Sequence, residues 1–183
     1  MYFLIFDTET TGFRAKNRLV QLAWQLYKNE DLKTEKCFVV KPNNFTIPRQ
    51  VVEIHGISTE IALEKGKPLK FVLKKFLNDL NFADYIVGHN LNYDIMVLDK
   101  EFSRLGITNT LMAKKKIDTM FVSTNFVKLP PVKYFTKYKY PKLKELYYFL
   151  FNKEMKNAHN ALADVKATAQ CFFELKKQGI IEI

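Results

Sequence analysis

Cysteine is scarce in this chain, because its 183 residues include only two, Cys37 and Cys171. The two lie far apart and lack the close spacing of metal-binding cysteines. Secreted disulfide scaffolds are rich in cysteine, so this usage favours a reduced cytoplasmic protein, with a single bridge as the open alternative.

Long apolar runs are also missing. No stretch reaches the roughly 18 residues that a membrane-spanning helix needs. The apolar start at residues 2–6 has no basic leader and ends too early for a signal peptide. We therefore predict no membrane span and a cytoplasmic location.

Acidic residues are outnumbered, with 19 Asp and Glu against 29 Lys and Arg, which gives a net charge of +10. A basic surface attracts polyanions, chiefly through contacts with phosphate groups. Most of the excess is lysine, and many soluble proteins are moderately basic. Charge alone therefore leaves two interpretations, nucleic-acid binding and ordinary lysine-rich usage.

Linkers, repeats and low-complexity tracts are absent as well, and 48% of the residues are hydrophobic. A chain of this length and composition can bury a core without support from metals or disulfides. We therefore predict a single domain over residues 1–183.

The hydrophobic pattern predicts strands first. The continuous apolar run at residues 2–6 is typical of a strand covered on both faces. Residues 19–27 alternate, with Gln21 and Gln25 on the polar side, which indicates a half-buried strand. Residues 37–40 form a third strand. Short connections join these three, so we expect them to be antiparallel.

Helical periodicity follows. The pattern predicts helices at residues 69–80, 94–105, 143–150 and 160–178, the last ended by Gly179, and short strands at 85–87 and around Ile117. Residues 121–142 are less regular, and residues 114–116 resemble an exposed basic turn. Early strands followed by alternating strands and helices predict an α/β fold around a mixed sheet with parallel later strands.

Asp7 and Glu9 close the first predicted strand. Residues two apart in a strand point to the same face, so these carboxylates lie side by side. Their charges repel, and a divalent cation such as Mg²⁺ or Mn²⁺ would relieve the repulsion through hard oxygen ligands. The alternative is an acidic turn, since Thr10, Thr11 and Gly12 follow.

Three further candidates lie downstream. Asp94 stands where a first-turn carboxylate would offset a helix dipole, which is its alternative explanation. Asp164 falls inside a predicted helix. It is either a site residue or a residue on the exposed flank of that helix. His159 precedes that helix and could approach the same point as Asp164 from the preceding loop.

Together these segments resemble the three motifs of the DEDDh-type 3′–5′ exonucleases. The matching segments are Asp7-Thr8-Glu9-Thr10-Thr11-Gly12, Gly88-His89-Asn90 with Tyr93-Asp94, and His159-Asn160-Ala161-Leu162-Ala163-Asp164. Two more segments resemble the branch of the proofreading epsilon subunit of bacterial DNA polymerase III and its stand-alone relatives: His55-Gly56-Ile57-Ser58 and Ile117-Asp118-Thr119. The resemblance covers essentially the whole chain.

The resemblance implies a ribonuclease H-like fold, with a central mixed sheet flanked by helices. It implies that His159 is a general base and that four carboxylates hold two divalent metal ions, Mg²⁺ or Mn²⁺. These carboxylates belong to Asp7, Glu9, Asp94 and Asp164. It also implies that six residues lie near the terminal nucleotide: Thr8, Thr10, Gly12, His55, Ile57 and Asn90.

Some of these positions have simpler explanations. His55 could cap or turn the loop before Ser58, itself a plausible helix N-cap, and Asn90 could shape the start of the helix that carries Asp94. The segment 130–148 interleaves lysines with aromatic residues, which suits either single-stranded nucleic acid or a solvated loop with local packing.

We therefore expect a 3′–5′ exonuclease that releases nucleoside 5′-monophosphates from single-stranded or frayed DNA, in proofreading, repair or turnover. The same chemistry on RNA or short oligoribonucleotides is one alternative. A non-catalytic nucleic-acid-binding accessory protein is another. The expected partners are nucleic acid with a free 3′ end and, as a further candidate, a polymerase.

Overall fold

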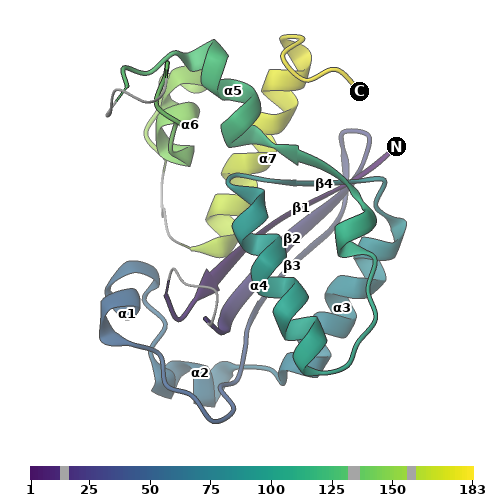
Figure 1. The fold of residues 1–183 in the computed structure, drawn as a ribbon, viewed down its shortest axis with the longest axis vertical. Helices are drawn as coiled ribbons and strands as arrows, with labels where there is room; N and C mark the ends of the chain where they lie inside the picture. Colours follow the sequence, from purple (N-terminus) through teal and green to yellow (C-terminus); the bar gives the residue numbers. More distant parts are fainter. Residues whose placement is uncertain (13–16, 132–136, 156–159) are drawn as a thin grey trace.

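A five-stranded sheet in the order β3-β2-β1-β4-β5 forms the centre of the computed structural model, which describes residues 1–12, 17–131, 137–155 and 160–183 (Figure 1). The strands are β1 Tyr2–Thr10, β2 Leu19–Lys28, β3 Asp31–Val39, β4 Tyr85–Gly88 and β5 Lys115–Asp118. β1, β2 and β3 pair antiparallel, whereas β4 pairs parallel to both β1 and β5. The predicted mixed sheet, antiparallel first and parallel later, is confirmed.

Helices cover both faces of this sheet (Figure 1). They are α1 Arg49–His55, α2 Thr59–Lys65, α3 Leu69–Phe82, α4 Leu91–Arg104, α5 Thr119–Val127, α6 Leu143–Phe151 and α7 Ala161–Lys177, with a short 3₁₀ helix, η1, at Leu111–Ala113. α3 and α4 pack on one face, and α7 packs on the other with α5 and α6 beside it. None of these helices is long and apolar enough to cross a membrane, a statement that holds for the described residues.

Alternation along β1 divides the core into two layers. Leu4 and Phe6 pack with Trp24, Phe76 and the rest of the α3–α4 layer. Phe3 and Ile5 point the other way, into the layer that α7 supplies. Because the alternation continues beyond the apolar residues, it also decides which layer each polar residue at the end of β1 will face.

Several sequence predictions were wrong in detail. β2 is buried along both faces, because α7 covers the side on which polar residues were expected. Gln21 is therefore buried, and its side chain accepts a hydrogen bond from the backbone N–H of Ala161 at 3.2 Å. Gln25 is buried as well and donates to Glu35 at 2.6 Å.

Element boundaries also differ. β3 begins at Asp31 rather than at residue 37, because the whole strand pairs with β2 across a tight turn at Asn29. Part of the irregular segment 121–142 is helical, as α5. Lys115 and Lys116, predicted in a basic turn, belong to β5. Gly179, at φ 72°, follows the end of α7 as predicted.

A close approach at Gly66 ties α2 to the end of the sheet. The backbone of Lys67 donates to Val39 and accepts from Lys41, both at 2.8 Å. A Cβ atom at Gly66 would lie 2.2 Å from the carbonyl oxygen of Ala62 and 2.6 Å from the backbone nitrogen of Lys41. Only a residue without a side chain leaves room for this contact.

We expect Gly66→Ala to lower the free energy of unfolding by about 3 kcal/mol, because rigid backbone must move to admit the methyl group. Urea denaturation measures this change. The control is Gly106→Asn, at φ 62° with open space around it, where asparagine tolerates the left-handed conformation. Equal stability of the two variants would contradict the steric argument.

Candidate functional site

Asp7 and Glu9 lie side by side at the end of β1. They share the strand face of Phe3 and Ile5, so both carboxylates point toward the layer that contains α7. The apolar part of the strand ends there, and the register of the β1–β2 pair shifts between Glu9 and Thr10. The strand thus places two acidic groups directly after its buried apolar residues.

Asp164 reaches the same point from α7. Asn160 is the N-cap of this helix, because its side chain accepts hydrogen bonds from the backbone N–H groups of Leu162 and Ala163. This cap places Asp164 in the first helical turn. One carboxylate oxygen from each of three residues, Asp7, Glu9 and Asp164, lies within 4.8 Å of the other two.

Asp94 approaches from the opposite layer, through the first turn of α4. Its Oδ1 accepts two hydrogen bonds from Thr8, at 3.0 Å from the backbone N–H and 2.5 Å from the hydroxyl. Successive residues of a strand point to opposite faces of the sheet, so Thr8 faces α4 whereas Asp7 faces α7. All four carboxylates line one cavity of about 580 Å³ at the end of β1.

Asp118 fixes the start of α4. Its carboxylate at the end of β5 accepts from the backbone N–H groups of Asn90 at 3.0 Å and Leu91 at 2.8 Å. The same carboxylate caps α5 by accepting from Met120 at 3.0 Å. Asn90 has a left-handed backbone, φ 68°, which turns the chain from β4 into the helix. Asn90 also lines the cavity, so it both shapes the helix start and faces the site.

Burial raises the pKa values of three carboxyl groups in the cavity, those of Asp7, Glu9 and Asp94. The pKa of Asp7 lies well above its ordinary value, first because the group is buried and then because the other carboxylates surround it. Burial, followed by repulsion from Asp164 and Asp94, raises the pKa of Glu9 to about 7. Burial also raises the pKa of Asp94 to about 7, against the opposing effect of the hydrogen bonds from Thr8.

These properties fit a divalent metal ion. Mg²⁺ and Mn²⁺ prefer carboxylate oxygens, and the cluster of Asp7, Glu9 and Asp164 offers three of them at one point. Without a cation, the site can hold its full negative charge only at a cost that appears in the raised pKa values. The acidic-turn alternative for Asp7 and Glu9 does not account for the third carboxylate that α7 brings to them.

Lysine and histidine form the other side of the site. Lys142 lines the carboxylate cavity, and Lys144 lines an adjoining one that also contacts Asp7 and Asp164. His89 holds this side in place, since its ring nitrogens lie 3.0 Å from Thr119 Oγ1 and 2.9 Å from the carbonyl oxygen of Pro141. Sequence reasoning singled out segment 130–148 for its lysines, but it could not place Lys142 beside the acidic cluster.

Thr10 and Gly12 belong to a hydrogen-bonded corner beside the site. The Thr10 hydroxyl lies 2.8 Å from the Tyr93 hydroxyl, and each of them contacts the carbonyl oxygen of Gly12 at 2.5 Å. Tyr93 also lines the carboxylate cavity. Its role was missed from the sequence, although it stands directly before Asp94 in the motif.

His55 and Ile57 occupy a neighbouring position. His55 is buried, and its Nδ1 accepts a hydrogen bond from the backbone N–H of Ile57 at 3.1 Å. Burial lowers the pKa of His55, and the backbone of Thr10 acts against that shift. Ile57 packs with Val20 in a small satellite core. The turn role expected for His55 is therefore present, and the contact with Thr10 brings it next to the end of β1.

His159 lies outside the described residues, so its predicted position beside Asp164 stays a prediction. The segment 130–148 lies partly outside them as well, at residues 132–136.

A family model described as "Exonuclease" matches residues 4–172 of this chain. The chain is also similar to two bacterial proteins named DNA polymerase III PolC-type. It is 27% identical to the one from Clostridium perfringens over 182 residues, and 29% identical to the one from Caldanaerobacter subterraneus over 177 residues. These alignments cover 96% and 94% of this chain but only 11% of each polymerase.

Solved structures show the same fold. Escherichia coli Exonuclease I in complex with a dT13 oligonucleotide superimposes with a TM-score of 0.80 and 24% identity, covering 96% of this chain and 41% of the other. A second structure of exonuclease I, described as explaining its processivity, gives a TM-score of 0.80 and 23% identity over 96% of this chain and 41% of the other. The ribonuclease H-like fold expected from the motifs is confirmed.

We expect Asp7→Asn to stabilise the metal-free protein by an amount that grows with pH. Where folded carboxyl groups have raised pKa values, the unfolded chain binds fewer protons, so stability falls as pH rises from about 4 to the folded-state pKa near 7. Asparagine removes one of the repelling charges, and we expect a gain on the order of 1 kcal/mol at pH 8.

Urea denaturation in EDTA at pH 5 and pH 8 measures this gain, with Asp31→Asn at the exposed start of β3 as the matched control. Added Mn²⁺ should stabilise the wild type more than Asp7→Asn. A loss of stability in Asp7→Asn at pH 8 would contradict the repulsion.

Proposed function

The chain belongs to the exonuclease family, and on that premise we propose that it is a divalent-metal-dependent 3′–5′ exonuclease. It removes nucleoside 5′-monophosphates one at a time from the 3′ end of single-stranded or frayed DNA. One observation carries the proposal: carboxylate oxygens of Asp7, Glu9 and Asp164 lie within 4.8 Å of one another in a cavity that Asp94 also lines.

The metal ligands in this proposal are Asp7, Glu9 and Asp164, with Asp94 assisting, and the ions are two Mg²⁺ or Mn²⁺. Such ions activate water and neutralise charge on the reacting phosphate. The protein supplies a fixed geometry for them: β1 holds Asp7 and Glu9, α7 holds Asp164, and the hydrogen bonds from Thr8 fix Asp94.

His159 is the general base of the proposed reaction. A histidine that titrates near neutrality can take a proton from the attacking water. Its place in the third motif supports this role, five residues before Asp164. On the opposite side, Lys142 supplies a positive charge toward which a substrate phosphate is drawn.

The terminal nucleotide lies against the corner formed by Thr8, Thr10 and Gly12, with Asn90 at its edge. His55 and Ile57 line its base or sugar. The contact between His55 and the backbone of Thr10 supports this placement, because it holds the ring next to the end of β1.

DNA is the proposed substrate, and RNA is the alternative for the same chemistry. The PolC-type DNA polymerases among the relatives support DNA, and the oligonucleotide in the Exonuclease I complex agrees with it. The chain spans only 11% of the length of those polymerases, so association with a polymerase, in proofreading or repair, is itself part of the proposal. The single exonuclease domain and the cytoplasmic location stay predictions.

The test compares matched 5′-labelled DNA and RNA oligonucleotides with Mg²⁺, Mn²⁺ or EDTA. Wild type should shorten the DNA stepwise from its 3′ end with either metal and leave it intact in EDTA. Asp7→Asn should lose nearly all activity, because the central metal ligand is gone, while Asp31→Asn should keep it. Binding of both nucleic acids without any cleavage would favour the accessory-protein alternative.

We expect His159→Ala to lower kcat by about 10²–10⁴-fold, the usual contribution of a general base. Calorimetric titration should find Mn²⁺ binding unchanged in this variant, because histidine is not among the proposed ligands. A simultaneous loss of Mn²⁺ binding would assign His159 to the metal site and remove it from the role of base.

A further inference from the structure

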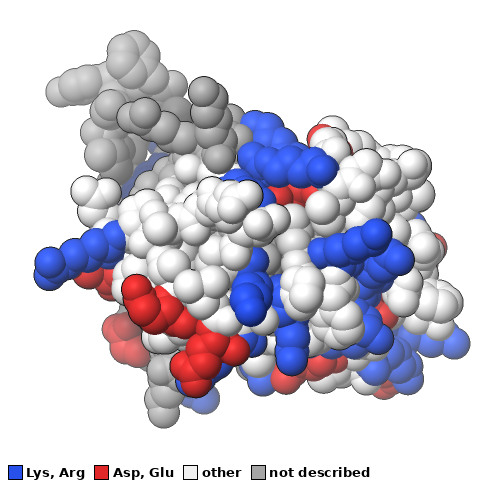
Figure 2. Space-filling view, turned by 90° about the horizontal axis from the view of Figure 1, so that it is seen from below, with Lys and Arg blue, Asp and Glu red and all other residues white. Residues whose placement is uncertain are grey.

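A second pocket, of about 660 Å³, lies at the C-terminal end of α4, away from the carboxylate cavity. We call it the basic pocket and define it by the charged and aromatic side chains that line it: Arg18, Lys41, Phe45, Lys70, Glu101 and Arg104. Figure 2 looks onto this end of the molecule, where Lys and Arg side chains gather across the middle of the face. Four cations here face one carboxylate.

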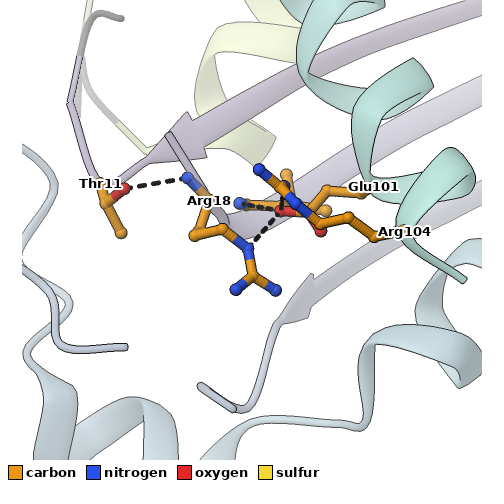
Figure 3. Close-up of polar contacts among 5 residues, drawn as sticks. Thr11, Arg18, Glu101 and Arg104 are labelled. Atoms are coloured by element: carbon orange, nitrogen blue, oxygen red, sulfur yellow. Dashed lines mark hydrogen bonds and ion pairs between the residues drawn. The ribbon is translucent and has the colours of Figure 1, made fainter. Parts of the chain in front are cut away.

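That carboxylate, Glu101, is buried at 1% exposure and organises two of the cations. Its Oε1 accepts from Arg18 Nε at 3.0 Å and lies 2.8 Å from Arg104 Nη1, as Figure 3 shows. Oε2 has no partner among the described residues. Each arginine therefore contacts Glu101 through a single nitrogen, and the fork of each guanidinium has other N–H donors for a ligand.

Arg18 is oriented further by an aromatic ring. Its guanidinium lies 4.5 Å from the centroid of Phe45, within cation–π distance. Its backbone is also bound to the end of β1, since Arg18 N–H donates to Thr11 Oγ1 at 2.9 Å and Thr11 N–H donates to the Arg18 carbonyl at 3.0 Å. Thr11 is only two residues beyond Glu9, so the pocket and the carboxylate cluster share one strand end.

A purely structural role, in which ion pairs link the start of β2 to α4, would explain Glu101 and its two arginines. It does not explain why two lysines line the same pocket. Lys41 and Lys70 are exposed, and neither forms an ion pair within the described part of the chain. Their positive charges add to those of the arginines around the same hollow without neutralisation. Such an arrangement is suited to a ligand with several negative charges, such as a phosphodiester backbone.

The distance to the carboxylate cluster fits one nucleic-acid strand. Asp94 and Glu101 are seven residues apart in α4, which is two turns, so both point from the same side of the helix. At 1.5 Å per residue they are about 10 Å apart along the axis. The nucleotides of a stacked helical strand rise ~3.4 Å each along its axis, so about three nucleotides span this distance.

We propose that the basic pocket binds the phosphate backbone of the substrate strand, about three or more nucleotides from the 3′ end held at the carboxylate site. This inference rests on the proposed function, which identifies the ligand as the nucleic-acid strand that the exonuclease degrades. Substrates too short to reach the pocket gain nothing from it, whereas longer strands bind more tightly and in a salt-dependent manner.

The test variant is Lys41→Met/Lys70→Met, which removes two exposed charges and leaves the Glu101 ion pairs intact. Lys41→Arg/Lys70→Arg keeps the charges. The matched control is Lys33→Met/Lys177→Met, which removes two lysines remote from the pocket: Lys33 near the start of β3, at the opposite end of that strand from Lys41, and Lys177 at the end of α7. Thermal unfolding of each variant tests whether it is folded.

We expect KM for a dT12 strand in 50 mM salt to rise about three- to tenfold in Lys41→Met/Lys70→Met, with kcat unchanged. The slope of log affinity against log salt should become shallower by about 0.7 for each phosphate that the variant no longer neutralises. The Lys→Arg variant and the control should behave as wild type. Hydrolysis of the p-nitrophenyl ester of thymidine 5′-monophosphate, which is too small to reach the pocket, should be equal in all of them.

Unchanged KM and salt slope for dT12 in Lys41→Met/Lys70→Met would overturn the proposal, as would an equal effect on the small ester. Fluorescence anisotropy of labelled dT12 in EDTA gives the same comparison without catalysis. If the wild type cleaves neither substrate, the proposed function fails, and the anisotropy difference between the Lys→Met variant and its control still decides whether the pocket binds the strand.

Discussion

Repulsion between carboxylates is the constraint on which this structure depends. Four acidic groups converge at the end of β1, where burial raises the pKa values of Asp7, Glu9 and Asp94 and repulsion within the cluster adds to the shifts of Asp7 and Glu9. Such a cluster of like charges, taken alone, lowers the stability of the fold. Its neighbours serve to hold it: the N-cap at Asn160 places Asp164, and Thr8 fixes Asp94 by two hydrogen bonds. The fold keeps carboxylate oxygens of Asp7, Glu9 and Asp164 within 4.8 Å of one another in spite of this repulsion.

Strand parity made much of this site predictable from the sequence. The alternation that sends Phe3 and Ile5 toward α7 also sends Asp7 and Glu9 there, and two residues of spacing suffice to see it. The order of strands and helices likewise followed from a change in hydrophobic period. Burial of Gln21 and Gln25 could not be foreseen, because it depends on α7, which lies more than a hundred residues later in the chain.

Other parts depend on contacts that no local pattern encodes. α5 has weak helical amphipathicity and packs against both α6 and α7. Lys142 lines the acidic cavity directly after Pro141, whose carbonyl oxygen contacts His89. Arg18 and Glu101 are 83 residues apart in sequence, yet they form an ion pair. Neither residue stood out in the sequence, because no local pattern links positions so far apart.

Asp118 links the starts of two helices in this architecture. One carboxylate caps both α4 and α5, through Leu91 on one side and Met120 on the other. The starts of the two helices are therefore held by one side chain, and the loss of that carboxylate would leave backbone N–H groups of both helices without their acceptor. Because Asp94 stands in the first turn of α4, the position of one member of the acidic cluster depends on a residue at the end of β5 that does not itself line the cavity.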